Sequence, residues 1–208
     1  MSHMALTIYG SPRSRTMRTL WIAAELGLDY THIPFAYDDP RLKQPEFLSL
    51  NPAGTIPTIV DDGFALSESL AINLYLAKRY ASTGPSPLYP QTLQGEADAW
   101  RWTLWAQGHL EPWVQRDALL LELREAVGHH ADKAVANALA TLNKTLAGRP
   151  WLLREHFTVA DLNVACVLSP SRAAHINLRP FASVEDWLSR CYARPASVAV
   201  RNRFAPGA

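Results

Sequence analysis

The sequence predicts an α/β domain followed by an all-helical domain. In the first eighty residues, short runs rich in β-branched and aromatic residues alternate with helical patterns. After residue 90 the apolar residues keep helical spacing, and no strand signal of comparable strength occurs. Between the two parts lies ASTGPSPLYP, which is rich in Pro, Ser and Gly. The predicted division is therefore a domain at residues 1–80, a linker at 81–90 and a helical domain at 91–208.

The first domain is expected to have the element order β-α-β-α-β-β-α. Ser14 is a candidate N-cap for the first helix, and Gly27 a candidate C-cap. The opening βαβ unit predicts that its two strands are parallel. The expected strands are 6–9, 30–35, 58–60 and 64–66, and the expected helices are 16–26, a short one within 38–50, and 68–80.

The second domain begins with a long helical segment from Thr92 to about Leu121, which Pro112 is expected to kink or split. Thr158 and Asp161 have the spacing of a capping box, which predicts the start of another helix. Further helices are expected at 132–146, 184–192 and 196–204.

Composition excludes several classes of protein. Lys and Arg number 20 against 19 Asp and Glu, so no basic excess indicates nucleic-acid binding. No apolar run approaches the roughly 20 residues that span a bilayer, and Met1–Met4 resembles a cloning remnant rather than a signal peptide. Cys166 and Cys191 lie in apolar surroundings, which is typical of buried, reduced thiols. Reduced thiols predict a cytoplasmic protein. No cluster has metal-ligand spacing, so we expect no metal.

The stretch Asn51–Thr58, NPAGTIPT, precedes an expected strand. Pro57 falls at the first residue of that strand, where its missing N–H does least harm. It can be an ordinary trans proline in a loop or a cis proline. In the cis case the N–H and C=O of Ile56 would face outward as an unpaired edge. Such an edge can hold a peptide backbone by strand addition.

The domain order and three motifs resemble the cytosolic glutathione transferase family. Asn51–Thr58 is similar to its N-P-x-G-x-[VI]-P motif with a cis proline. Leu66–Ile72 is similar to its E-S-x-A-I motif, and Thr158–Asp161 to its capping box. The resemblance covers essentially the whole chain. It implies a thioredoxin-like first domain, a homodimer, and a role in detoxification by conjugating the glutathione thiolate to small apolar electrophiles.

The resemblance implies a glutathione site built from the first domain. Ile56, before a cis Pro57, would pair with the cysteine backbone of glutathione. Ser69 and its helix N-terminus suit the γ-Glu carboxylate, and Glu68 suits the ammonium group. Alternatively, Glu68 and Ser69 only cap the helix. For the glycine carboxylate the candidates are Lys43, Gln44 and Thr55, the last standing where many relatives have a basic residue.

A hydroxyl near the first helix is expected to activate the glutathione thiol. A free thiol has a pKa of about 8.5, so a hydrogen-bond donor to sulfur must favour the thiolate. By resemblance to serine-type members, Ser11 is the catalytic candidate. Ser14 is the runner-up, with the N-cap role as its alternative. Tyr9 is the third candidate, with core packing as its alternative. A serine here rather than a cysteine argues against members that form a mixed disulfide.

The electrophile is expected to contact the helical domain. Trp105, His109 and Trp113 recur at i, i+4 and i+8, which predicts a shared helix face and an aromatic pocket. Their alternative is packing in the core. Two other functions remain open: a glutathione-dependent disulfide reductase or peroxidase on the same fold, and a non-catalytic binding module.

Overall fold

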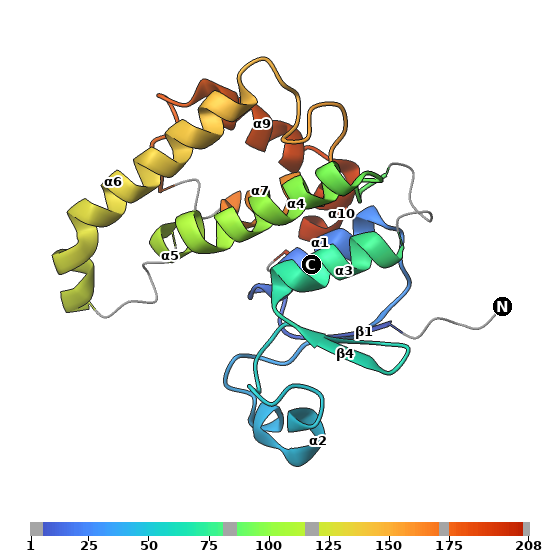
Figure 1. The fold of residues 1–208 in the computed structure, drawn as a ribbon. Coiled ribbons are helices and arrows are strands. Elements are labelled where there is room, and N and C mark those ends of the chain that lie inside the picture. The colour runs from blue at the N-terminus through green and yellow to red at the C-terminus, as the bar shows by residue number, and fades with distance from the viewer. Residues whose placement is uncertain (1–5, 81–86, 115–120, 171–174, 206–208) are drawn as a thin grey trace. The chain divides into compact units, whose positions relative to one another are not determined.

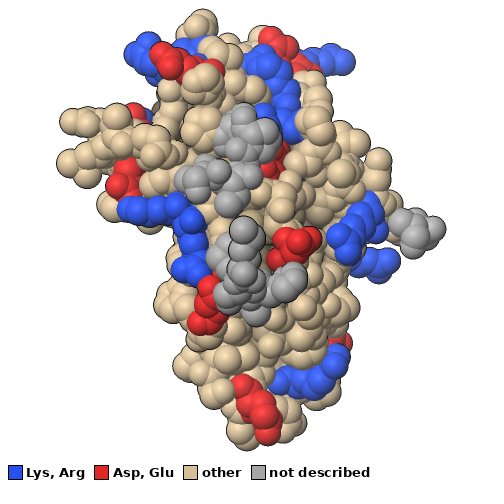
Figure 2. Space-filling model, turned by 90° about the vertical axis from the view of Figure 1, so that its right-hand side faces the viewer, with Lys and Arg blue, Asp and Glu red and all other residues tan. Residues whose placement is uncertain are grey.

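The computed structural model describes residues 6–80, 87–114, 121–170 and 175–205 (Figure 1). The chain forms two compact units. The first contains the described residues of 1–85 together with those of 195–208, and the second those of 86–194. In the described part of the chain, no helix is both long and apolar enough to cross a bilayer. Figure 2 shows basic and acidic groups scattered over one face without a large area of either sign.

The first unit is built on a four-stranded mixed sheet with the order β2-β1-β3-β4. Strand β1 is parallel to β2 and antiparallel to β3, which is antiparallel to β4. The parallel pair confirms the expected βαβ opening. Strand β2 is shorter than expected and ends before Pro34, which has no N–H to donate to a neighbouring strand. The strands are β1 Leu6–Tyr9, β2 Thr31–Ile33, β3 Thr58–Asp61 and β4 Phe64–Ser67.

Helices cover both faces of this sheet. Helix α1, Thr16–Glu25, packs against α3, Ser69–Arg79, on one side, and α2, Pro45–Leu48, lies on the other (Figure 1). A 3₁₀ turn, η1, at Pro40–Lys43 precedes α2. The confirmed order of elements is thus the thioredoxin-like one. The last helix, α10, at Pro195–Arg203, packs against α1 and so belongs by its contacts to the first unit.

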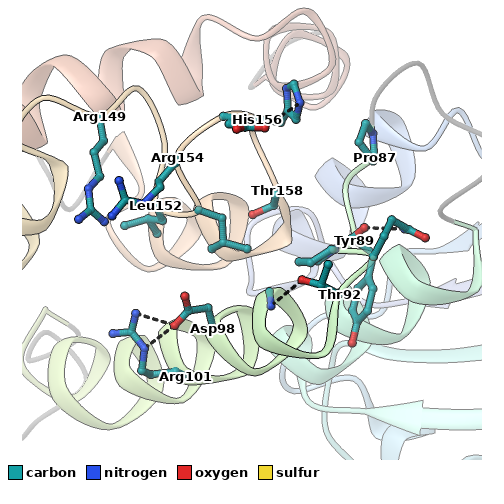
Figure 3. A pocket seen from close by; sticks show the side chains of 15 residues that line it. Pro87, Tyr89, Thr92, Asp98, Arg101, Arg149, Leu152, Arg154, His156 and Thr158 are labelled. Atoms are coloured by element: carbon teal, nitrogen blue, oxygen red, sulfur yellow. Dashed lines mark hydrogen bonds and ion pairs between the residues drawn. The ribbon is translucent and has the colours of Figure 1, made fainter.

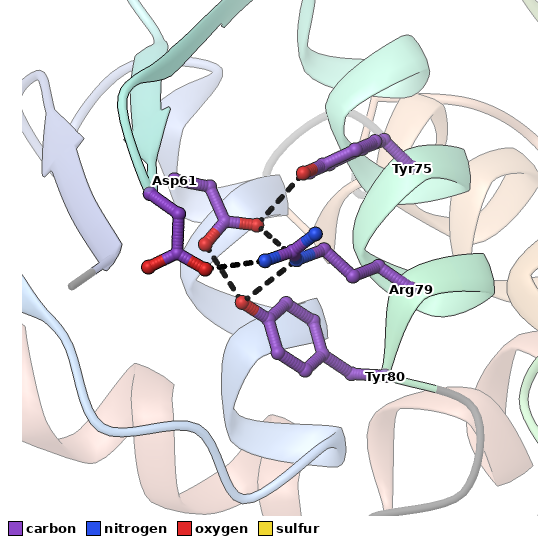
Figure 4. A network of polar contacts seen from close by, with 5 residues as sticks. Asp61, Tyr75, Arg79 and Tyr80 are labelled. Atoms are coloured by element: carbon purple, nitrogen blue, oxygen red, sulfur yellow. Dashed lines mark hydrogen bonds and ion pairs between the residues drawn. The ribbon is translucent and has the colours of Figure 1, made fainter. Parts of the chain in front are cut away.

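The buried side chain of Asp61 connects α3 to the sheet through hydrogen bonds and an ion pair. The carboxylate of Asp61, at the end of β3, accepts hydrogen bonds from the hydroxyls of Tyr75, at 2.9 Å, and Tyr80, at 2.7 Å (Figure 4). It also lies 2.8 Å from Nε of Arg79. These three partners come from α3 and its C-terminal end. The network therefore fixes the helix, and with it the helix N-terminus, relative to β3.

Among the described residues of the second unit, every regular element is a helix, and one isolated β-bridge joins Trp151 and Arg154. Helix α4 ends at Trp105 and continues through a π-helical turn, η2, into α5. Pro112 is the second residue of α5, directly after the π-helical turn. The interruption therefore begins a turn before the proline. The helices are α4 Leu93–Trp105, η2 Ala106–Leu110, α5 Glu111–Val114, α6 Leu121–Leu146, α7 Val159–Val167 and α9 Ala182–Tyr192.

The expected capping box at the start of α7 is confirmed. Asp161 is fully buried and accepts bonds from Thr158 N, at 3.0 Å, Leu152 N, at 2.9 Å, and Trp187 Nε1, at 2.9 Å. Burial raises the pKa of the Asp161 carboxyl, and these bonds act in the opposite direction. The side chain thus joins α7, the segment before it and α9. Both cysteines, Cys166 and Cys191, are buried and free.

Candidate functional site

The stretch Asn51–Thr58 forms a loop that ends in a cis peptide bond between Ile56 and Pro57. Both residues are buried. In the described part of the chain, neither the N–H nor the C=O of Ile56 forms a hydrogen bond. Backbone groups of a folded protein are almost always paired, so an unpaired N–H and C=O on one residue mark a place where another backbone can bind.

Asn51 holds this loop in shape. Its Nδ2 lies 3.0 Å from the carbonyl oxygen of Thr55 and 3.0 Å from the hydroxyl of Thr58, and its Oδ1 accepts from Ala53 N. Sequence reasoning assigned Asn51 no role of its own, although a buried amide at the start of a loop motif is a usable signal. These bonds position the residues on both sides of Ile56.

Lys43 reaches the same loop from η1. Its Nζ donates to the carbonyl oxygens of Gly54, at 3.1 Å, and Ala53, at 3.3 Å. Gly54 has a φ of 57°, and a Cβ there would lie 2.6 Å from the carbonyl oxygen of Leu42. The ammonium group therefore stands beside the loop with one donor left. Gln44, at the start of α2, and Thr55, in the loop, are exposed.

The turn between β1 and α1 distinguishes the two candidate serines. The hydroxyl of Ser14 lies 2.7 Å from the carbonyl oxygen of Ser11 and 2.8 Å from Oγ1 of Thr16, and it accepts from Thr16 N. Ser14 is not the N-cap residue itself, because Arg15 occupies that position without a side-chain bond. Its single hydrogen is engaged within the turn.

The hydroxyl of Ser11 is differently placed. Its oxygen accepts from Arg13 N at 3.2 Å, and its hydrogen has no acceptor among the described residues. The preceding residue, Gly10, approaches the Ile56 loop so closely that a Cβ on it would lie 2.9 Å from Cβ of Ile56. Ser11 therefore follows the residue that lies against Ile56, and its O–H can donate to a ligand there.

Tyr9 packs in the core below this turn. Its ring lies 5.7 Å from that of Phe35 and 5.5 Å from that of Phe47, between centroids. This cluster covers the α2 side of the sheet together with Leu42 and Ile56. These contacts agree with the alternative role of Tyr9, which is packing in the core.

His32 supports the turn from β2. Its Nε2 lies 2.8 Å from the carbonyl oxygen of Gly10, and because that oxygen only accepts, Nε2 carries the hydrogen. The imidazole also packs edge-on against Phe204, which follows α10. The N–H of Gly10 donates to Ile33 O, so both polar groups of Gly10 are held by β2.

The N-terminus of α3 completes the site. Glu68 precedes the helix with a φ of 69°, which is rare for a residue with a side chain, and it makes no side-chain cap bond. Its carboxylate is exposed. Ser69 is buried, and its hydroxyl accepts a bond of 3.3 Å from Nη1 of Arg18 on α1. Arg18 is only 4% exposed, so a guanidinium lies under the start of α3.

The three candidate residues for the electrophile lie in the second unit. The half-buried ring of Trp105 packs edge-on against Trp102 at 5.1 Å, and His109 is exposed. Trp113 lines a cavity of 550 Å³ with residues of α6 and of the segment before α9, and neither Trp105 nor His109 lines that cavity.

In a comparison with known proteins, both parts of the chain match models of protein families. Residues 4–78 match the family model of the glutathione S-transferase N-terminal domain. Residues 103–195 match that of the glutathione S-transferase C-terminal domain. Together the two matches include every residue of the Asn51–Thr58 loop, the turn before α1 and the start of α3.

Individual relatives match over nearly the full chain. Glutathione S-transferase 3 of Zea mays is 34% identical, over 92% of this chain and 90% of the relative. Glutathione S-transferase D7 of Drosophila melanogaster is 32% identical, over 88% of this chain and 82% of the relative. The solved structure of glutathione S-transferase III in its apo form is 30% identical, with a TM-score of 0.78, and covers 98% of this chain and 99% of that one.

Proposed function

The chain belongs to the glutathione S-transferase family and is a glutathione transferase, and we propose that it joins the glutathione thiolate to small apolar electrophiles. The observation that carries the assignment of the site is the unpaired N–H and C=O of Ile56, next to the turn that bears Ser11. The Ile56 edge binds the cysteine backbone of the tripeptide, and buried Pro57 keeps that edge in place.

The two ends of glutathione bind on either side of this edge. The γ-Glu carboxylate binds at the N-terminus of α3 beside Ser69, where the helix dipole favours an anion, and the buried Arg18 beneath adds positive charge. Glu68 receives the ammonium group, which accounts for its exposed carboxylate and unusual backbone. Lys43 binds the glycine carboxylate with its remaining donor, next to Gln44 and Thr55.

Ser11 acts as the donor to sulfur. Its hydrogen is available, whereas that of Ser14 is engaged in the turn and Tyr9 packs in the core. A hydrogen bond to the thiolate favours the charged form and so lowers the thiol pKa. The conjugation then proceeds by attack of the thiolate sulfur on an electrophilic carbon, whose leaving group takes the bonding electron pair.

The remaining assignments extend this proposal. Trp105, His109 and Trp113 contact the electrophile, whose flat or aromatic body they suit. The protein works in the cytoplasm as a homodimer in detoxification, uses glutathione as a co-substrate and requires no metal. The exposed Phe64, Trp100 and Leu104 side chains are apolar surface that a second copy can cover.

Three single variants test the thiol assignment: Ser11→Ala, Ser14→Ala and Tyr9→Phe. For each, the pKa of bound glutathione is measured from the thiolate absorbance, and kcat with an aromatic halide. Ser11→Ala should raise the bound thiol pKa by about one to two units and lower kcat about 10- to 100-fold at neutral pH. If Ser14→Ala raises the thiol pKa instead, Ser14 is the donor. A Ser11→Ala protein with wild-type turnover would refute the assignment.

A further inference from the structure

The turn before α1 is held by residues of the first unit, including some from the far end of the described chain. The 420 Å³ cavity between α4 and the segment 149–158 (Figure 3) and the 550 Å³ cavity that Trp113 lines belong wholly to the second unit. The described residues 195–205, in contrast, belong by their contacts to the first unit. Through Phe204 they reach β2, the strand next to β1.

Strand β2 has few contacts that fix it within the sheet. It is only three residues long and stands at the edge, where it pairs with β1 alone among the described strands. A short edge strand forms few ladder hydrogen bonds, so other contacts decide how firmly it is held. Side-chain contacts with neighbouring segments therefore matter more for β2 than for β1 or β3, which are paired on both sides.

Two residues where α10 ends supply such contacts. The ring of Phe204 lies 5.4 Å from the imidazole of His32, between centroids, at an interplanar angle of 76°. The guanidinium of Arg203 lies 5.3 Å from the centroid of the Phe204 ring and 6.0 Å from that of Tyr30, the residue before β2. An edge-on aromatic pair and a cation over an aromatic ring are both attractive arrangements. The four residues therefore connect the end of α10 with β2.

His32 connects these residues with the turn that bears Ser11. Its Nε2–H donates to the carbonyl oxygen of Gly10 at 2.8 Å. That carbonyl belongs to the planar peptide unit between Gly10 and Ser11, so a bond to its oxygen restricts the rotation of the whole unit. The restriction is needed here because Gly10, with a φ of 131°, has no side chain to limit its backbone. The imidazole of His32 thus sets the direction in which the backbone enters Ser11.

The imidazole can serve this purpose only in one orientation. A half-buried side chain at a sheet edge can rotate between staggered rotamers, and rotation away from Gly10 would break the hydrogen bond. The same rotation would lose the edge-on contact with the Phe204 ring, because one imidazole makes both contacts. Phe204 therefore favours the rotamer that donates to Gly10. Arg203, which lies over the Phe204 ring, favours the position of that ring.

We propose that Phe204 is a positioning residue for thiol activation. Its ring keeps the His32 imidazole directed at Gly10, and the peptide unit after Gly10 sets where the Ser11 hydroxyl stands relative to the glutathione sulfur. The proposal rests on the proposed function, because it takes Ser11 as the donor to sulfur. Phe204 itself binds no part of glutathione, whose assigned contacts lie elsewhere in the first unit. Its loss should therefore change the ionisation of the thiol and not the affinity for glutathione.

The first test observes the imidazole itself and needs no ligand. In protein labelled with ¹⁵N-histidine, the Nε2–H signal of His32 is assigned by its loss in His32→Gln. The wild type should exchange this proton slowly with water, and Phe204→Leu, which keeps an apolar side chain but no ring, should exchange it at least about fivefold faster. Phe204→Tyr retains the ring and should behave like the wild type, as should Val198→Ala at an exposed position of α10. An unchanged exchange rate in Phe204→Leu would refute the positioning role, whatever the role of Ser11.

The second test measures the pKa of bound glutathione from the thiolate absorbance, and kcat with an aromatic halide. Phe204→Leu should raise this thiol pKa by about half a unit to one unit and lower kcat about three- to tenfold at a pH below both pKa values. At a pH well above both values the thiol is ionised in either protein, so the two kcat values should agree. KM for glutathione should stay within about twofold of the wild-type value. A loss of kcat that is equal at every pH, or a loss confined to KM, would show a merely structural role and overturn the proposal.

A double variant keeps this test separate from that of the donor. Phe204→Leu added to Ser11→Ala should raise the thiol pKa no further than Ser11→Ala does alone, because both changes act on one hydrogen bond. Additive shifts would show that Phe204 acts independently of Ser11 and contradict the proposal. If Ser11→Ala raises the thiol pKa and Phe204→Leu leaves it unchanged, the donor assignment stands and the positioning role fails. If only Phe204→Leu raises it, Phe204 positions the turn and the donor is another hydroxyl of that turn.

Discussion

The guanidinium of Arg18 donates to the hydroxyl of Ser69 across 3.3 Å and so connects the first turn of α1 with the first residue of α3. Both side chains are buried. Because the turn with Ser11 leads into α1 and the proposed γ-Glu site begins α3, this bond couples the two parts of the proposed glutathione site. A change on α1 can reach the start of α3 through this contact.

Replacement of Arg18 tests this coupling. Arg18→Lys keeps the charge but loses the planar fork, so the bond to Ser69 is expected to fail. A bond to a charged group is worth about 1.5–3 kcal/mol, which predicts a rise of about tenfold or more in KM for glutathione. Arg13→Lys, an exposed neighbour, is the control and should leave KM unchanged. Equal KM values for all three proteins would mean that Arg18 serves only the packing of α1.

His32 is predicted to position the turn before α1. In His32→Ala the carbonyl of Gly10 loses its partner, at a cost of about 1 kcal/mol, and kcat/KM for glutathione should fall about fivefold. His32→Gln retains an N–H donor and should recover part of the loss. His156→Ala, at an exposed position of the second unit, is the control. A loss that glutamine does not reduce would point to packing against Phe204 rather than to the hydrogen bond.

Gly10 is predicted to tolerate no side chain. A Cβ there would lie 2.1 Å from Oγ1 of Thr16 and 2.9 Å from Cβ of Ile56, and the φ of 131° adds backbone strain. Gly10→Ala should therefore lower the free energy of unfolding by about 3 kcal/mol and abolish glutathione binding. Gly27→Ala is the matched control, because Gly27 has a φ of 63° but open space around it.

The control should lose only about 1 kcal/mol, from backbone strain, and bind glutathione normally. Urea unfolding and calorimetric titration measure the two quantities. Equal losses of stability in Gly10→Ala and Gly27→Ala would contradict the close approach between the turn and the Ile56 loop.

Tyr75 is predicted to make stability fall in alkaline solution. Burial, followed by the hydrogen bond to Asp61, raises the pKa of Tyr75 to about 12. The unfolded chain releases this proton near pH 10, so the contribution is complete below about pH 10 and is lost as the pH rises through 12. The difference in free energy of unfolding between the wild type and Tyr75→Phe should therefore shrink between pH 9 and about pH 11.5. Urea unfolding of both proteins at each pH measures this difference. A constant difference would show that the Tyr75 hydroxyl titrates alike in both states.

The order of the elements followed from the sequence because each is locally encoded. Strands 6–9 and 64–67 alternate side-chain types between turn residues, and Thr158 and Asp161 mark a helix start by their spacing alone. Arg18 could not be predicted from such signals, because a basic residue on an amphipathic helix usually faces water. It is buried because α3 covers it, and that contact spans 51 positions of the chain.

The candidate serines show the same limit on a smaller scale. The sequence places Ser11 and Ser14 in one turn and cannot say which hydrogen is engaged. That distinction depends on the turn closing so that Ser14 reaches both Ser11 O and Thr16, which only the backbone geometry decides. Lys43 is similar: its basic side chain was a candidate ligand group, and its contacts with the Ala53 and Gly54 carbonyls depend on how the loop folds back.

Helix α10 has a consequence for the order in which the protein is completed during synthesis. It packs against α1 and leads to Phe204, which contacts His32, yet it is translated after the whole second unit. Domains generally fold as the ribosome releases them, from the N-terminus onward. The first unit, although most of it is translated first, therefore remains unfinished until residues 195–204 have emerged. Phe204, whose ring packs against His32, is among the last residues to be made.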